Sequence, residues 1–441
     1  MRSLATTFGS CLLLGCVTVD PEPEEQRAWD AVTAATGVDP SAAVEPVGDA
    51  LTLDEATRRA ITTHPEIAAA FKEIGIAKAD WVGSGLPSNP VLSLATFFPS
   101  GGGSAGMEGG LAWKFLDLWM IPTRRDAAAA RLRATVLRVA ALASDRVHET
   151  RVLYYEALAS AERLVLYEKE EALRAETLGQ ISTQRDSGRA SAWEVSVAES
   201  ARLHASLAVL EAGRDARRAR RALGERIGAP LAEAVHLTTP LPETAGPASP
   251  PLDATALVEA SLESRLELRV LREEIEAAVA GEALAGTSWL KSASLGIAGE
   301  RADRPSGNPD RGPSRFGPSL AVPLPIFDRG EAASASALYR RKQLELRLAA
   351  ATTRVEREIL DALDALETAR RATAFARDSL VPATTRRLSY SRAAYDAGSV
   401  GITDVTLAER DRLDTLHLAL RARLEAAIAE ADLAHAVGTS D

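Results

Sequence analysis

Residues 186–195 read DSGRASAWEV, and residues 396–405 repeat the pattern as DAGSVGITDV. Each stretch begins with an acidic residue two places before a glycine and ends with a carboxylate followed by valine. Ile227-Gly228 returns in the same way as Val437-Gly438, again 210 residues later. A constant interval of this length indicates that a long block of sequence has been duplicated.

The first repeat begins with a predicted helix, two strands and a very long helix. Apolar residues spaced three, four or seven apart predict a helix over residues 51–82, and alternating residues then predict a strand hairpin closed by a Gly-rich loop. A helix from Thr123 to about Gln184 follows. It has roughly 60 residues and a length of roughly 90 Å, so it cannot fold back on a compact core. Gly188 turns the chain into a returning helix over residues 192–226.

The second repeat has the same elements in the same order. Helices are predicted over residues 254–285 and 330–395, with a kink at Pro382, and over residues 403–436 after the turn at Gly398. The strands are expected at about 90–98 and 109–116 in the first repeat and at about 292–300 and 317–324 in the second.

These elements predict a chain of two repeats with short flanking segments. The predicted parts are a signal peptide (1–15), a lipid-anchored tether (16–49), the first repeat (50–230, turn at about 186–194), a Pro-rich linker (231–251), the second repeat (252–438, turn at about 395–404) and a tail (439–441).

Composition excludes several classes of protein. Aromatic residues make up only 5% of the chain, and the helical stretches are rich in Ala, Leu, Arg and Glu, as in long packed helices. The formal net charge of −10 argues against a nucleic-acid partner. No apolar run reaches the roughly 20 residues of a transmembrane helix, so any part that crosses a membrane is expected to consist of strands.

The N-terminus has the features of an exported lipoprotein. A short apolar stretch leads to Leu13-Leu14-Gly15-Cys16, which resembles the lipobox of bacterial lipoproteins, and Cys16 is the expected acylated residue. An ordinary signal peptide with an incidental cysteine is the alternative. The other cysteine, Cys11, precedes the expected cleavage site, so no internal disulfide is expected. Val17 after the lipobox favours sorting to the outer membrane.

No pattern of enzyme or cofactor chemistry is found in the sequence. The six histidines lack zinc-ligand spacing, and there is no phosphate-binding loop, serine nucleophile elbow or dinucleotide fingerprint. Carboxylates are plentiful but follow the exposed faces of predicted helices. The sequence therefore predicts a protein that is not an enzyme and needs neither cofactor nor metal.

Together, the duplicated unit, the lipobox and two motifs resemble the TolC family of outer-membrane efflux proteins. The motifs are VPLPIFDRG at residues 322–330 and YDAG at 395–398 followed by TDV at 403–405. The resemblance covers nearly everything from Leu51 to Gly438. It implies a mainly α fold with a membrane β-barrel: three copies, each with four strands, form a 12-stranded barrel continued by a helical-barrel tunnel across the periplasm.

The resemblance also implies a function, partners and a location. The expected protein is a passive, homotrimeric exit duct in the outer membrane of a Gram-negative bacterium, anchored by lipid and served by a periplasmic adaptor and an inner-membrane pump. The segments HPEI (64–67) and LPSNP (86–90) look most like members that export heavy-metal cations; drugs are the other expected cargo. A periplasmic adaptor, with one hairpin in a β-rich chain, and a coiled-coil scaffold without a pore remain alternatives.

In this family the two turns close the periplasmic end and contact the adaptor. A threefold ring of carboxylates there repels itself and attracts cations, so Glu194 and Asp404 are candidates for a gate and selectivity filter. Equally, both acids stand where carboxylates favour the first turn of a helix, which predicts a capping role instead. The candidate residues are Asp186, Gly188, Arg189 and Glu194 in the first repeat and Tyr395, Asp396, Gly398, Ser399 and Asp404 in the second.

Overall fold

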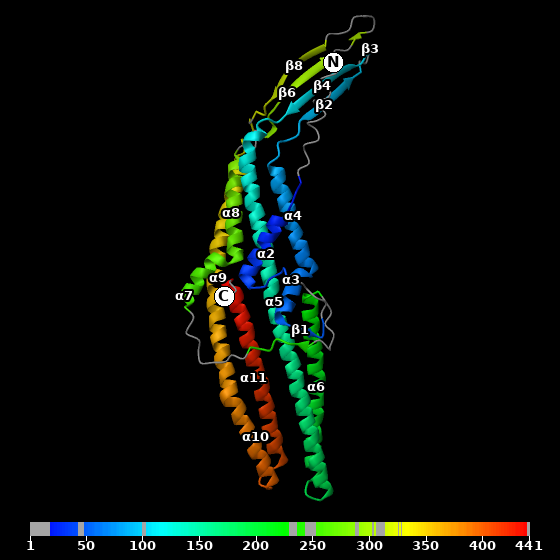
Figure 1. Ribbon diagram of the computed structural model, residues 1–441, viewed down its shortest axis with the longest axis vertical. Helices are drawn as coiled ribbons and strands as arrows, with labels where there is room; N and C mark the ends of the chain where they lie inside the picture. The colour runs from blue at the N-terminus through cyan, green and yellow to red at the C-terminus, as the bar shows by residue number, and fades with distance from the viewer. Residues whose placement is uncertain are drawn as a thin grey trace. The chain divides into compact units, whose positions relative to one another are not determined.

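A computed structural model describes most of the chain (Figure 1). The chain divides into two compact units. The first unit comprises Met1–Gln26, Lys72–Arg138 and Glu267–Ala351, and the second comprises Arg27–Phe71, Val139–Leu266 and Thr352–Asp441. The described residues are 18–42, 48–98, 103–228, 236–242, 253–286, 291–301, 304–305, 314–324, 326–327 and 329–438.

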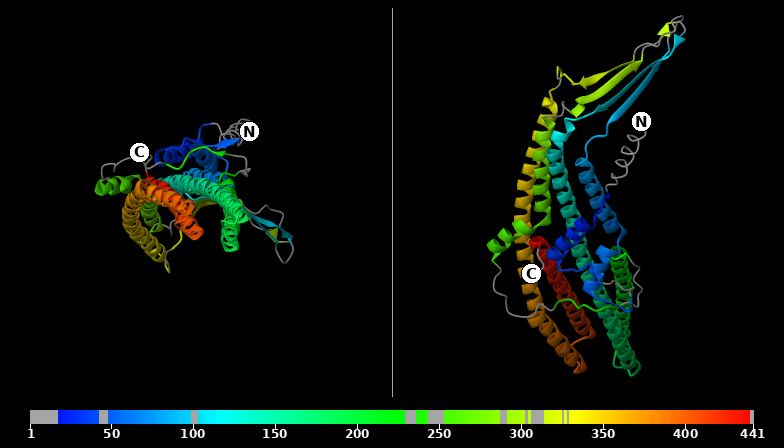
Figure 2. Two further views of the ribbon diagram at one scale, coloured as in Figure 1. Left: turned by 90° about the horizontal axis from the view of Figure 1, so that it is seen from below. Right: turned by 45° about the horizontal axis from the view of Figure 1, so that its top comes forward.

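Two antiparallel helical hairpins make up most of the second unit (Figures 1 and 2). The first pairs the later part of α5 (Asp117–Asp186) with α6 (Ala192–Arg226). The second pairs α10 (Val381–Asp396) with α11 (Ile402–Val437). Helix α10 continues α9 (Glu331–Phe375) through one π-helical turn, η3 (Ala376–Leu380).

Near Pro382, where a kink is predicted, the structure has a π-helical turn. Proline has no N–H and its ring clashes with the carbonyl four residues earlier, so the regular helical ladder cannot pass it unchanged. A π-turn over Ala376–Leu380 ends two residues before Pro382 and supplies the local change in hydrogen bonding. By contrast, α5 begins at Asp117, before Pro122 rather than after it as predicted.

A small core ties the upper ends of both hairpins together within the second unit. Tyr154 of α5, Leu223 of α6 and Leu420 of α11 are buried in one cluster with Leu51 and Leu241. Leu51 belongs to β1 (Ala50–Leu51), which pairs in parallel with β5 (His236–Leu237). This core therefore fixes the segment after the first hairpin against the start of the first repeat.

Two helices that periodicity predicts as continuous are each broken. Residues 51–82 form α3 (Leu53–Thr62) and α4 (Pro65–Ser84), because proline suits the first position of a helix better than its interior. Residues 254–285 form α7 (Ala254–Ser264) and α8 (Leu266–Ala285), interrupted at Arg265.

The same kind of hydrogen bond is found at the two helix breaks, one in each repeat. Before the first, the Thr63 hydroxyl donates to the carbonyl of Ile227 at the end of α6, at 3.0 Å. Before the second, the Ser264 hydroxyl donates to the carbonyl of Val437 at the end of α11, at 3.0 Å. Each of these helices ends at a glycine of positive φ, Gly228 or Gly438, so the repeats share this detail of structure as well as sequence.

The first unit contains an antiparallel sheet of four strands in the order β2-β4-β6-β8. The strands are β2 (Val91–Phe97), β4 (Gly106–Trp113), β6 (Ser294–Arg301) and β8 (Ser314–Ala321). A second pair, β3 (Gly103–Ser104) with β7 (Arg304–Pro305), extends the pairing of the two repeats. Strands β4 and β8 begin earlier than predicted because pairing, rather than alternation, extends them through glycine-containing segments.

The segment expected to be an N-terminal tether contains a helix. Helix α2 (Glu22–Thr36) buries Ala28 and Val32 completely, and the ring of Trp29 stacks on Phe71 with centroids 4.1 Å apart. The guanidinium of Arg151 donates to the carbonyl of Thr36 at 2.7 Å, and this contact lies inside the second unit. Part of the predicted tether is therefore docked on the helices.

The prediction of a mainly helical chain with few strands is confirmed. Within the described segments, no helix combines the length and the apolar character needed to cross a membrane.

Candidate functional site

The two hairpin turns have the same backbone hydrogen bonds at an interval of 210 residues. The N–H of Arg189 donates to the carbonyl of Gln184 at 2.7 Å, and that of Ser399 donates to the carbonyl of Ala394 at 2.9 Å. Each bond spans five residues, as in a Schellman turn at the end of a helix. Duplication has thus preserved the turn geometry although the side chains differ.

A glycine is required at the centre of each turn. Gly188 has φ of +75° and Gly398 has φ of +74°, values that other residues rarely adopt. A Cβ at either position would meet nothing within 4 Å, so backbone conformation rather than space explains both glycines.

Glu194 and Asp404 cap the helices that leave the turns. The Glu194 carboxylate accepts hydrogen bonds from the N–H of Ser191 at 2.7 Å and from its hydroxyl at 2.8 Å. These bonds lower the pKa of Glu194. The Asp404 carboxylate accepts from the N–H of Gly401 at 3.2 Å. Both acids therefore occupy capping positions, and the cap holds their charge close to the turn.

The turns of the two repeats meet through Tyr395. Its hydroxyl donates to Oε1 of Gln184, in the other hairpin, at 3.0 Å. Beneath this bond, Ile181 of α5 packs with Ile402 and Val405 of α11, and all three are nearly inaccessible to solvent. Burial raises the pKa of Tyr395, and the nearby charges of Glu194 and Asp396 raise it further. Sequence pattern alone did not single out Gln184.

The remaining candidate residues lie at the exposed ends of the turns. Asp186 and Asp396 are the last residues of α5 and α10, and both are exposed. Arg189 donates from Nε to the Ser187 hydroxyl at 3.2 Å, and the Ser399 hydroxyl donates to the carbonyl of Ala394 at 2.8 Å. Within the described part of a single chain, Arg189 forms no ion pair with a turn carboxylate.

A buried ionic cluster joins the hairpins farther from the turns. Arg174 of α5 pairs with Glu170 at 2.6 Å and lies 3.8 Å from Glu409 of α11. Arg392 of α10 donates to Glu409 at 3.0 Å. Only 1% of the Glu409 side chain is exposed, so it depends on these arginines for compensation. Burial raises the pKa of Glu170.

The four-stranded sheet of the first unit has two chemically different faces. Leu92 lies opposite Leu111, which lies opposite Ile297, and paired residues point to the same side of a sheet. The apolar face carries Leu92, Leu94, Leu111, Ile297, Phe316 and Leu320, all at least half exposed. The other face carries mostly small and polar residues, including Ser93, Glu108, Glu300, Arg315 and Ser319, with Val91 and Phe97 at the two ends of β2.

Both edges of this sheet are open. Strands β2 and β8 are the outer strands, and neither has a partner on its outer side among the described residues. The ring of Phe316 lies over Gly299, where an added Cβ would be 2.6 Å from it. An apolar face that remains exposed, such as this one with Phe316 81% accessible, is typical of a surface meant for lipid or another protein.

One predicted site lies outside the residues that the structure describes. Cys16 precedes the described residues. Among the described residues, no three His, Cys, Asp or Glu side chains are grouped so that they could hold a metal ion.

A family model described as "Outer membrane efflux protein" matches residues 257–439. This is most of the second repeat. The sequence matches none of the curated proteins.

Several solved structures share the fold over almost their entire length. A membrane protein from Pseudomonas aeruginosa is 19% identical, with a TM-score of 0.71 over 87% of this chain and 93% of the other. The open state of the MtrE outer membrane channel of Neisseria gonorrhoeae is 19% identical, with a TM-score of 0.68 over 93% and 96%. The outer membrane protein VceC of Vibrio cholerae is 16% identical, with a TM-score of 0.68 over 88% and 96%.

These likenesses agree with the hairpins and the two-faced sheet. A periplasmic adaptor is not favoured, since it would have one hairpin in a β-rich chain, whereas this chain has two hairpins and mainly helical structure. Family and fold also agree with the predicted location in the outer membrane. The second repeat thus matches the model of outer-membrane efflux proteins, and the chain as a whole shares the fold of outer-membrane channels of known structure.

Proposed function

We propose that three copies of the chain form a passive exit duct in the outer membrane. The observation that carries this proposal is the open sheet with one exposed apolar face. In lipid, every backbone N–H and C=O must be satisfied, so a sheet with two unpaired edges cannot lie in a membrane alone. Pairing β8 of one copy with β2 of the next removes both edges.

The number of strands favours three copies. A closed barrel needs about eight strands or more, which a chain with four strands in its main sheet does not have. Three copies supply 12 strands, with the apolar face toward lipid. The face with Glu108, Glu300 and Arg315 then lines an aqueous lumen.

The first hairpin presents a surface suited to association between copies. Leu203, Leu207 and Leu210 of α6 are spaced at four and three residues, so they form one ridge, and each is more than half exposed. In the proposed trimer this ridge packs against helices of a neighbouring copy and continues the barrel as a helical tunnel across the periplasm.

The proposed duct receives cargo from other proteins. An inner-membrane pump supplies the energy, and a periplasmic adaptor contacts the hairpin turns. Cys16, as the acylated first residue, adds a lipid anchor; replacing Cys16 with serine should abolish labelling by a palmitate analogue. Heavy-metal cations and drugs are the proposed cargo classes.

The test of the duct is its mass and shape in detergent. Protein purified from outer membranes should have the mass of a trimer and give elongated particles in negative stain. A monomeric or globular particle would overturn the proposal, and a trimer without ion conductance in planar bilayers would indicate a scaffold instead.

The turns are the proposed gate of the duct. Glu194 and Asp404 recur three times in a trimer, so six carboxylates surround the periplasmic end and favour cations. Glu194→Gln with Asp404→Asn keeps an oxygen acceptor for each cap but removes the charge. This double variant should lose cation preference in planar bilayers. Preserved preference would leave the two acids only their capping role, whereas Glu194→Ala with Asp404→Ala would perturb cap and charge together.

A further inference from the structure

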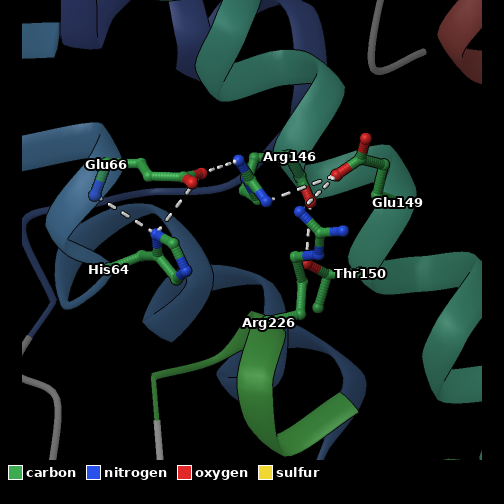
Figure 3. Close-up of polar contacts among 6 residues, drawn as sticks. All are labelled: His64, Glu66, Arg146, Glu149, Thr150 and Arg226. Carbon is green, nitrogen blue, oxygen red and sulfur yellow. Dashed lines mark hydrogen bonds and ion pairs between the residues drawn. The ribbon is translucent and has the colours of Figure 1, made fainter. Parts of the chain in front are cut away.

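His64 caps helix α4 through its imidazole ring. The N–H of Glu66 donates to Nδ1 of His64 at 3.3 Å (Figure 3). The N–H of Ala68 donates to the His64 carbonyl at 3.2 Å. A backbone N–H can only donate, so Nδ1 contributes its lone pair and carries no proton. This side-chain cap therefore exists only while the imidazole is neutral.

The same ring nitrogen also faces a carboxylate. His64 Nδ1 lies 3.9 Å from Oε2 of Glu66, and that oxygen accepts a hydrogen bond from Nη2 of Arg146 at 2.6 Å (Figure 3). A proton on Nδ1 makes this nitrogen a donor, which cannot accept from the Glu66 N–H. Protonation thus exchanges the cap of α4 for an ion pair with the Glu66 side chain.

Glu66 is the first member of an ionic chain that joins three helices. Arg146 of α5 lies 3.5 Å from Glu149, and Glu149 pairs with Arg226 of α6 at 3.0 Å (Figure 3). We call Glu66, Arg146, Glu149 and Arg226 the first-repeat clasp. Glu66 faces His64 directly, and the ion pairs continue from it through Arg146 and Glu149 of α5 to Arg226 of α6.

Arg146 is the buried partner of its pair with Glu66, whose side chain is 67% exposed. Arg146 is only 7% exposed, and its Nε has no hydrogen-bond partner among the described residues. A buried cation that loses part of its compensation is strongly destabilising. When Glu66 turns toward a protonated His64, Arg146 shares its closest carboxylate, and the attachment of α4 to α5 weakens.

The second repeat has a cation of constant charge at the equivalent place. The matching caps of Ile227 and Val437 show that His64 and Arg265 occupy corresponding positions. Arg265 donates from Nη1 to the carbonyl of His435 at 3.0 Å. A guanidinium keeps its proton at every physiological pH, whereas histidine changes its charge between about pH 5 and 8.

We propose that His64 is an acid-sensitive switch that acts on the first repeat alone. At neutral pH its ring caps α4, and the Glu66 carboxylate pairs with Arg146 alone. In acid the cap is lost, Glu66 is shared, and the first turn of α4 loosens from α5, while the junction at Arg265 is unchanged. This inference concerns the monomer's own helices and does not depend on the proposed duct.

Hydrogen exchange of the full chain in detergent tests the switch. Protection factors, corrected for the intrinsic exchange rate, are compared at pH 8 and pH 5 for peptides covering residues 63–70. The wild type should lose protection about fivefold at pH 5, the effect of losing one helix cap. His64→Asn retains a neutral acceptor at both pH values, so its protection should stay high and constant. His64→Arg should give low protection at both.

Two controls keep the result specific. Residues 266–272, which follow Arg265, should keep their protection in the same sample, because burial lowers the pKa of His435 to about 4 and this neighbour stays neutral at pH 5. His204→Asn alters an exposed histidine of α6 and should behave as the wild type. Equal wild-type protection at the two pH values, or an acid-induced loss that persists in His64→Asn, would overturn the proposal.

Discussion

The Tyr395 hydroxyl donates to Oε1 of Gln184 across 211 residues of sequence, so one side-chain hydrogen bond joins the turns of the two repeats. The two repeats differ at the position that forms this bond. Arg185 stands in the first repeat where Tyr395 stands in the second, so the first repeat offers no phenol for a reciprocal bond. Three copies would carry three such ties at the proposed gate.

Tyr395→Phe removes the tie but keeps the ring in its cluster. A side-chain hydrogen bond contributes about 1 kcal/mol, so the closed state should lose about that much and the open population should rise about fivefold. Single-channel recording in planar bilayers measures this change. Tyr390→Phe is the matched control, because that ring is 71% exposed. Equal open probability in the wild type and Tyr395→Phe would exclude a latching role.

Tyr154→Phe should destabilise the core that joins β1 and β5. The buried hydroxyl of Tyr154 donates to the carbonyl of Leu51 at 3.0 Å and accepts from the N–H of Thr239 at 2.9 Å. Its removal leaves a polar group unsatisfied in the interior, which costs about 1–3 kcal/mol. Denaturant unfolding followed by circular dichroism measures the loss. Tyr155→Phe, at the neighbouring ring, should cost less, and equal losses in both would contradict the assignment.

Gly296→Val should prevent assembly of the sheet. A Cβ at Gly296 would lie 2.3 Å from the Leu111 carbonyl and 2.9 Å from Ala112 Cα, and backbone atoms of a paired strand cannot move away cheaply. Gly317→Val, in β8, meets nothing within 4 Å and serves as the control. We expect oligomer recovered from membranes to fall severalfold only for the first variant; normal recovery would show that the strands can part.

His435 should make the fold less stable in acid. Burial, together with the stacked ring of His148 whose centroid lies 4.5 Å away, lowers the pKa of His435 to about 4. Above about pH 6.5 the ring is neutral in the folded and unfolded chains and contributes nothing. Below that pH only the unfolded chain binds the proton, so stability falls by up to about 3 kcal/mol as the pH approaches 4.

His435→Gln isolates this contribution from that of other titrating groups. Unfolding free energies of wild type and variant are compared at pH 7, 5.5 and 4.5 in one detergent. The difference between the two proteins should change with pH below 6.5 and be constant above it. His204→Gln, at an exposed site, should show the wild-type pH dependence. Parallel curves for wild type and His435→Gln would contradict the expectation.

Local signals explain which helices could be predicted. The expected helix over residues 192–226 has the bounds of α6, because Ser191 and Glu194 form a capping box that is legible in sequence. The break before Pro65 was missed since periodicity continues across it. The break at Arg265 has neither proline nor glycine to mark it; Ser264 and Arg265 donate to carbonyls at the end of α11, and that contact depends on tertiary structure.

Sequence likewise identifies some residues of the candidate site and misses others. The turns at Gly188 and Gly398 follow from residues a few places apart, so sequence identifies them. Gln184 and Glu409 do not stand out, because their partners lie in another helix and no local pattern connects them. Strand β4 contains Gly109 and Gly110, which cannot show alternation, and its pairing with β2 therefore had to come from the fold.

The unpaired edges of β2 and β8 have a consequence for biogenesis. A solitary copy exposes two rows of backbone groups and an apolar surface, which is the form of sheet most prone to wrong pairing. Its helical hairpins have their own core, but in the proposed trimer the outer strands gain their partners only by encounter with other copies. Stability of that end therefore follows mass action, and slow delivery to the membrane favours aggregation over insertion.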